Sequence, residues 1–270
     1  MTNALFYCVT LRTALQLTVM AKKNVDLSKV VRQHLEMDVF FTGDFGIKTE
    51  YSETQDADLE HESGPDGTGN METAKGLKEI ADQVNNCCQC GLGQSRTNAV
   101  PGEGSPNARI AFVGEAPGAD EDRQGKPFVG RAGKLLDKII KAMGMRREDV
   151  YICNILKCRP PDNRDPKPDE IIKCLPYLQQ QLETIKPEII IALGAHAART
   201  LLESNKPIGQ LRGKFHEYYP SMITKPIKLM ATYHPAYLLR NYSQDNRRKV
   251  WEDMQKVLSE LGLEMPSTRS

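Results

Sequence analysis

The sequence predicts an α/β protein, built as a three-layer α/β/α sandwich around a central, mostly parallel four-stranded sheet. Short, largely apolar runs alternate along the chain with longer segments whose apolar residues recur at helical spacing. Strands of a parallel sheet that is covered by helices on both faces have this apolar character. The 270 residues are enough for one or two domains, and 40% apolar and 26% charged residues are typical of a globular chain.

The first half of the pattern begins with an amphipathic helix over residues 71–87. A strand over 109–113 then ends in a glycine-rich loop, and residues 133–144 carry apolar side chains at helical spacing. A second strand is expected over 149–156. The next helix is expected over 167–186, with a proline in its first turn, where proline is tolerated.

The second half repeats the alternation. A buried strand is expected over 187–194, a helix over 195–204, a further short strand over 214–220, a strand over 227–235 and a closing helix over 246–261. The strand ends place three loops on one edge of the sheet, where open α/β sheets bind their ligands. These loops are Gly114–Gly130, Asn154–Pro168 and His234–Asn241.

The amino-terminal part differs from the rest in composition. Residues 50–70 are acidic and small, with too few apolar side chains to offset the entropy of ordering them, and we expect a flexible linker there. Before it, a helix is expected near residues 27–36. We therefore divide the chain into an extension over 1–70, which translation from Met71 would leave out, and a domain over 71–265.

Charge and hydropathy narrow the functional classes. Residues 1–70 carry a net charge of −5 and residues 71–270 a net charge of +6, so the body allows a polyanionic partner without requiring one. No apolar run reaches the roughly 18 residues that span a membrane, and the start of the chain lacks a basic leader. We expect a cytoplasmic protein that does not contact a membrane.

Seven cysteines suggest a metal centre, because clustered cysteines in a cytosolic protein are more often ligands than disulfides. Cys87 and Cys90 form one pair, with Cys88 as a possible substitute for Cys87, and Cys158 and Cys174 form the second pair. Four thiolates suit either zinc or an iron–sulfur cluster, and the spacing leaves both open, as well as cysteines without a metal. Cys153 lies in a strand and is expected to be a buried core residue.

Four motifs together resemble the family 4 uracil-DNA glycosylases, the iron–sulfur branch of their superfamily. The motifs are "GEAPG", "GKPFVGRAG", "YICNILKCRPPDNRDP" and "HPAYLLRN", and the resemblance covers about Cys87 to Leu261. The sequence lacks the basic, histidine-containing insert of the relatives that trap uracil covalently, so ordinary turnover is expected. The resemblance implies a structural 4Fe–4S cluster held by Cys87, Cys90, Cys158 and Cys174.

The resemblance also implies the parts of an active site. Phe128 would stack on a flipped uracil, Asn154 would bond its edge, and His234 would stabilise the departing base. Glu115 would orient the attacking water, or its backbone would, and Glu121 would lie near uracil C5. Gly114 and Ala116 would complete the uracil pocket, Leu238 would wedge into the base stack, and Arg131 and Arg240 would contact phosphates.

The function expected from this resemblance is hydrolysis of the bond between uracil and deoxyribose in DNA. The products would be free uracil and an abasic site, without strand cleavage, since no lysine stands out as a Schiff-base nucleophile; we expect a monomer. Two alternatives remain at this stage: a cluster-containing nucleic-acid-binding module without activity, and a zinc-stabilised enzyme that acts on a nucleotide. His196 and His216 lie outside the motifs and are interpreted as structural or surface residues.

Overall fold

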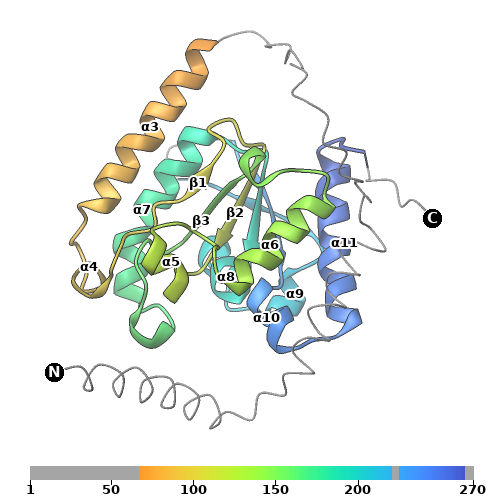
Figure 1. Cartoon of the computed structure of the whole chain (residues 1–270). Coiled ribbons are helices and arrows are strands. Elements are labelled where there is room, and N and C mark those ends of the chain that lie inside the picture. Colours follow the sequence, from red (N-terminus) through yellow and green to blue (C-terminus); the bar gives the residue numbers. More distant parts are fainter. Residues whose placement is uncertain (1–66, 221–224, 265–270) are drawn as a thin grey trace, which may run out of the picture.

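The computed structural model describes residues 67–220 and 225–264 (Figure 1). Within this part of the chain, helices cover both faces of one central sheet, which confirms the predicted three-layer architecture. The predicted acidic linker up to residue 66 and the helix expected near 27–36 lie outside the described residues. The strands are β1 (Glu103–Gly104), β2 (Ile110–Gly114), β3 (Tyr151–Asn154), β4 (Ile189–Leu193), β5 (Phe215–Tyr218) and β6 (Ile227–Thr232).

Helices connect these strands. The longer ones are α3 (Gly67–Asn85), α6 (Arg131–Ala142), α7 (Pro168–Ile185), α8 (Ala195–Leu202) and α11 (Gln244–Glu260). Shorter ones are α4 (Leu92–Ser95), α5 (Ala119–Gln124), α9 (Ile208–Leu211) and α10 (Pro235–Arg240), with 3-10 turns η2 (Arg147–Asp149) and η3 (Pro161–Asn163).

The sheet has the strand order β1-β3-β2-β4-β6-β5. The inner four strands run parallel, whereas β1 and β5 pair antiparallel with β3 and β6 at the two edges. The predicted strand number of four is therefore wrong for the described residues, where the sheet has six. β5 is the short strand expected near 214–220; β1 is only two residues long and both are exposed, so it leaves no apolar signal in the sequence.

The inner strands are apolar because each of their faces is covered. In β2, Ile110 and Phe112 join the layer beneath α6, α10 and α11, while Ala111 and Val113 face α7 and α8. All residues of β2 are buried. The period of two that would mark a half-exposed strand is therefore absent from β2, as expected for a sheet buried on both sides.

α3 lies along the outer side of α7, as Figure 1 shows. It begins at Gly67, four residues before the predicted start at Met71. Ile80 and Val84 of α3 pack with Leu92 and the cysteines in a third apolar cluster, separate from the two layers on the sheet. α3 thus covers the cysteine region, and its Leu77 also packs against the core layer of α7 and α8 on the sheet.

A buried ion pair fixes the end of β6. The Asp253 carboxylate of α11 is fully buried and accepts hydrogen bonds from Thr232 Oγ1 at 2.7 Å and from Arg212 Nη2 at 2.8 Å. The Arg212 guanidinium also lies 5.6 Å from the centre of the Tyr233 ring. This network holds the residues that lead from β6 into the loop at its carboxyl end.

The part of the chain that the structure describes contains no helix that is both long enough and apolar enough to cross a membrane.

Candidate active site

A cavity of about 430 Å³ opens at the carboxyl edge of the four parallel strands. All three loops that the sequence places on this edge line it, together with the turn between β4 and α8. Of the predicted residues, the cavity is lined by Glu115, Ala116, Glu121, Phe128, Asn154, His234 and Arg240. The strand topology therefore brings together residues that are more than a hundred positions apart in the sequence.

Asn154, the last residue of β3, lines this cavity and has a buried amide oxygen without a hydrogen-bond partner among the described residues. Its side chain is 1% exposed, and Oδ1 has no hydrogen-bond partner among the described residues. A buried acceptor without a partner costs about 1–3 kcal/mol. The backbone carbonyl of the same residue is held by Lys157, whose Nζ donates to it at 2.9 Å. Asn154 Oδ1 is therefore a free acceptor among the described residues, and an N–H donor would satisfy it.

Phe128 lies against Asn154 in a strained backbone conformation. Its φ is 50°, in the left-handed region that a bulky residue rarely adopts, and its carbonyl accepts a hydrogen bond from Arg147 Nη1 at 3.2 Å. A Cβ atom at Gly114 would lie 2.6 Å from Phe128 Cζ and would also clash with Asn154 Oδ1. The bare glycine therefore lets the aromatic ring and the amide occupy one wall of the cavity.

His234 caps the amino terminus of α10 and is neutral. Its Nδ1 accepts a hydrogen bond from the Ala236 N–H at 3.0 Å, which leaves the proton of a neutral ring on Nε2. Burial, with a smaller contribution from the Arg240 charge, lowers the pKa of His234 to about 4. The ring lies 5.6 Å from the Phe128 ring, between centroids. The cavity therefore has a neutral Nε2–H donor that needs no protonation.

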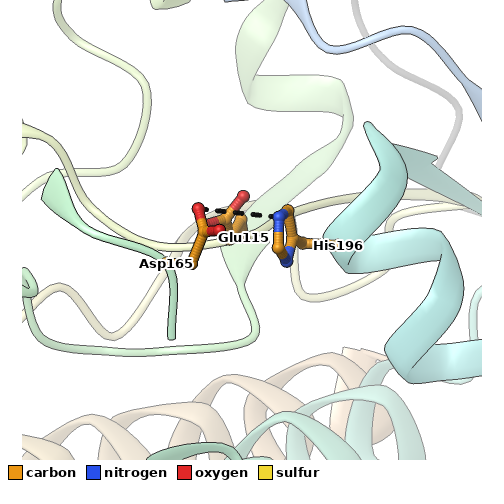
Figure 2. Close-up of side chains that lie close together, drawn as sticks. All are labelled: Glu115, Asp165 and His196. Carbon is orange, nitrogen blue, oxygen red and sulfur yellow. Dashed lines mark ion pairs between the residues drawn. The ribbon is translucent and has the colours of Figure 1, made fainter. Parts of the chain in front are cut away.

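Glu115 follows β2 and meets two residues from other segments, Asp165 and His196 (Figure 2). The three side chains place their carboxylate and imidazole atoms within 4.8 Å of one another, and His196 Nε2 lies 3.7 Å from Asp165 Oδ1. Burial is the main reason that the pKa of Glu115 is raised; His196 and Arg240 oppose the shift and Asp165 adds to it. Burial thus favours the neutral carboxyl group, whereas the charges of His196 and Arg240 favour the carboxylate.

His196 also lines the cavity, although it lies outside the motifs and the sequence leads us to expect a structural or surface residue. It stands in the first turn of α8, directly after a turn in which Gly194 has a φ of 90°. β4 lies between β2 and β6 in the sheet, so this turn lies between Glu115 and His234. A Cβ at Gly194 would be 2.9 Å from that of His234. The signal in the sequence was the glycine–histidine turn at the carboxyl end of a buried strand.

Glu121 lines the cavity but uses both of its oxygens on the backbone. One accepts from the N–H groups of Val129 and Gly130, each at 2.9 Å, and the other accepts from the Gly118 N–H at 3.1 Å. The carboxylate therefore ties the two ends of the loop together and holds the segment that carries Phe128.

The three residues predicted to contact DNA differ in position. Leu238 is 1% exposed and packs in the core layer with the residues of α6, and its role as a wedge stays a prediction. The sequence could not show which face of α10 turns inward. Arg240 ends α10 at the cavity and is exposed, and Arg131 begins α6 on the surface. Both arginines are accessible to a phosphate.

The four predicted ligand cysteines line one second cavity, with Arg96, Lys157 and Tyr177 among its other residues. All four cysteines are free thiols. Cys87 and Cys90 lie between α3 and α4, Cys158 lies in the loop after β3, and Cys174 lies in α7. Arg96 Nη1 donates to Cys158 Sγ at 3.0 Å, and the Lys157 N–H donates to Cys174 Sγ at 3.2 Å. Such donors favour thiolate sulfur, so the cysteines present fit a metal or cluster. The four cysteines that line this cavity are Cys87, Cys90, Cys158 and Cys174. Of the other two that the structure describes, Cys88 is exposed and Cys153 is buried in the core.

Comparison with known proteins points to one family. The family model described as the uracil DNA glycosylase superfamily matches residues 101–255. The chain is 49% identical over 186 residues to the type-4 uracil-DNA glycosylase of Saccharolobus solfataricus, covering 67% of this chain and 84% of the relative. It is 47% identical over 192 residues to that of Sulfurisphaera tokodaii, covering 69% and 85%. It is 47% identical over 191 residues to that of Thermotoga maritima, covering 70% of this chain and 97% of the relative.

These matches span both the cavity and the glycine-rich loops beside it, and they agree with the resemblance that the motifs indicate. This chain belongs to the uracil-DNA glycosylase superfamily, and within it to the type-4 uracil-DNA glycosylases.

Proposed function

We propose that this protein is a monofunctional uracil-DNA glycosylase, which flips uracil out of DNA into the cavity and hydrolyses its N-glycosidic bond, starting base excision repair. The observation that carries the proposal is the buried Asn154 Oδ1, which has no partner among the described residues and belongs to a residue that lines the same cavity as His234, whose pKa is lowered to about 4. Uracil offers an N3–H donor beside an O4 acceptor, which matches the two ends of a carboxamide. Family membership supports the same substrate.

The chemistry follows from the positions of these groups. Phe128 provides a buried aromatic face on which a flipped base stacks. Removal of the base from the DNA double helix costs a few kcal/mol, which these contacts offset. As the bond between N1 and C1′ breaks, negative charge develops on the uracil oxygens. The Nε2–H of His234 donates a hydrogen bond to that charge, in the manner of an oxyanion hole.

Water completes the reaction. The Glu115 carboxylate orients a water molecule toward C1′ and takes up its proton, so the sugar gains a hydroxyl group and uracil leaves as its anion, which is then protonated. The raised pKa makes the Glu115 carboxylate a somewhat stronger base than an ordinary carboxylate, and a modest base is enough because much of the bond to the leaving base is broken before water adds. Arg240 and Arg131 would contact phosphates of the strand that carries the flipped base.

The cysteine cavity fits the cofactor that the family implies. Cys87, Cys90, Cys158 and Cys174 would hold a 4Fe–4S cluster, which would supply structural cross-linking of α3, the loop after β3 and α7. Asn154 is four residues before Cys158, so a fixed cysteine loop also fixes the end of β3. We propose that the protein acts as a monomer on uracil-containing DNA.

The test combines a spectrum with an excision assay. The protein, purified without air, is incubated with a labelled oligonucleotide that holds one uracil, then treated with alkali, and free uracil is measured by chromatography. We expect a broad band near roughly 400 nm and alkali-dependent cleavage at uracil only. Asn154→Ala and His234→Ala are expected to lose excision. His216→Gln is the matched control, since His216 lies on β5 outside the cavity and bonds the Leu211 carbonyl.

Two results would contradict the proposal. A protein with the band that binds the oligonucleotide without releasing uracil would be a binding module. A colourless protein that contains zinc and acts on free nucleotides would be the other alternative left open by the sequence.

A further inference from the structure

Glu115 has a conflict that its neighbours must resolve. To orient water, its carboxylate has to be ionised, yet the same burial that shields the reaction from solvent raises its pKa. The function proposed above, on which this inference rests, assigns no role to His196 or Asp165. Both residues nevertheless bring their polar atoms within 4.8 Å of those of Glu115 (Figure 2).

We propose that His196 and Asp165 are positioning residues for Glu115: the protonated imidazole keeps the carboxylate of Glu115 ionised in acid, and Asp165 holds the imidazole from the solvent side. The order of exposure supports this arrangement. Asp165 has 81% of its side chain exposed and His196 has 42%, whereas Glu115 lines the cavity, so the three form a path from solvent to the reacting water.

The remaining charged groups around the cavity do not change with pH in the same way. Arg240 is permanently charged and favours ionised Glu115, and Arg164 is paired with Glu170, its Nη1 lying 2.9 Å from Oε2. Glu121 is bonded to three backbone N–H groups. The pKa of His234 is about 4, so it stays neutral above that pH.

Histidine is the side chain that ordinarily changes its charge between pH 5 and 8. A protonated His196 is a cation within 4.8 Å of Glu115, and its charge favours the ionised carboxylate. At a separation of 4.8 Å, even with the full screening of bulk water, one unit charge shifts a pKa by about half a unit. Asp165 has the opposite sign, so its removal must shift the ionisation of Glu115 the other way.

The experiment measures single-turnover uracil excision by the cluster-containing protein between pH 4.5 and 8.5, with EDTA present so that no divalent cation occupies the three side chains. His196→Gln is expected to move the acid limb of the rate profile up by about half a pH unit, making excision about threefold slower in acid and unchanged at pH 8. Asp165→Asn is expected to move the limb down. His196→Lys, which keeps a cation, restores the wild-type limb. His216→Gln is the matched histidine control.

The opposite directions separate electrostatic positioning from a structural role, because damage to the fold slows both variants at every pH. The visible spectrum and the melting temperature verify that each variant is folded. The inference is overturned if the wild-type protein excises uracil and both variants keep its acid limb, or if both limbs move in one direction. Failure of the proposed function is a different result: the wild-type protein itself then releases no uracil.

Discussion

Replacing Gly114 by alanine should abolish base recognition while leaving the fold in place. Gly114 ends β2 in an ordinary backbone conformation, so alanine meets no torsional penalty there. The added methyl group would lie 2.6 Å from Phe128 Cζ and would overlap with Asn154 Oδ1. One of the two side chains must leave the wall of the cavity.

The size of the effect follows from these contacts. Overpacking by one methyl group costs about 1–3 kcal/mol, which lowers the melting temperature by about 2–12 °C for a domain of this size. Loss of two hydrogen bonds to the edge of the base, worth about 1–3 kcal/mol each when a buried group is left unpaired, slows excision by at least about thirtyfold.

The assay is single-turnover excision beside thermal melting, with Gly209→Ala as the matched control. Gly209 lies in α9, and a Cβ atom there meets nothing within 4 Å. The control should therefore melt no lower than the wild type and excise uracil at the same rate. If Gly114→Ala retains the wild-type rate, the assignment of the Phe128–Asn154 wall to uracil is refuted.

Three further predictions concern stability and the cysteine centre. Arg212→Met leaves the buried Asp253 carboxylate without its partner and should lower the free energy of unfolding by about 3–5 kcal/mol in urea denaturation; a loss under 1 kcal/mol would contradict the buried pair. The pKa of His234 is lowered from 6.5 to about 4 in the folded protein, so between these pH values the unfolded chain binds a proton at His234 and the folded chain does not. Stability should therefore fall by up to about 3 kcal/mol as pH drops from 6.5 to 4, and His234→Gln should remove this part of the pH dependence. Cys158→Ser should lose the band near roughly 400 nm, which the exposed Cys88→Ser should keep; equal spectra would contradict the ligand set.

The sequence predicts those parts of the fold that depend on local pattern. The runs that form β2, β3, β4 and β6 are apolar because both faces of the inner strands are covered, and the loops at their carboxyl ends meet at one cavity as expected. β1 is different, since two exposed residues pair with β3 through backbone groups alone. Such a strand has no pattern of its own to detect.

Local sequence pattern places some residues of the site and leaves the position of others open. The motifs place Phe128, Asn154 and His234 correctly in the cavity because each follows a strand or lies in a loop of the predicted edge. His196 lines the cavity because β4 lies between β2 and β6. The order of strands in a sheet cannot be predicted from the pattern of any one segment. Leu238 is buried because of the way α10 rotates onto α6, which depends on the packing of a six-residue helix and not on its sequence pattern.

One lysine connects Asn154, which we propose reads the base, with the cysteine cavity. Lys157 is 1% exposed; its Nζ donates to the Asn154 carbonyl and to Gln181 Oε1, and its own N–H donates to Cys174 Sγ. Gln181 in turn donates to the Pro101 carbonyl at 2.8 Å. A displacement of Cys174 would thus be transmitted to the end of β3 through one residue, whose backbone contacts the sulfur and whose side chain contacts Asn154.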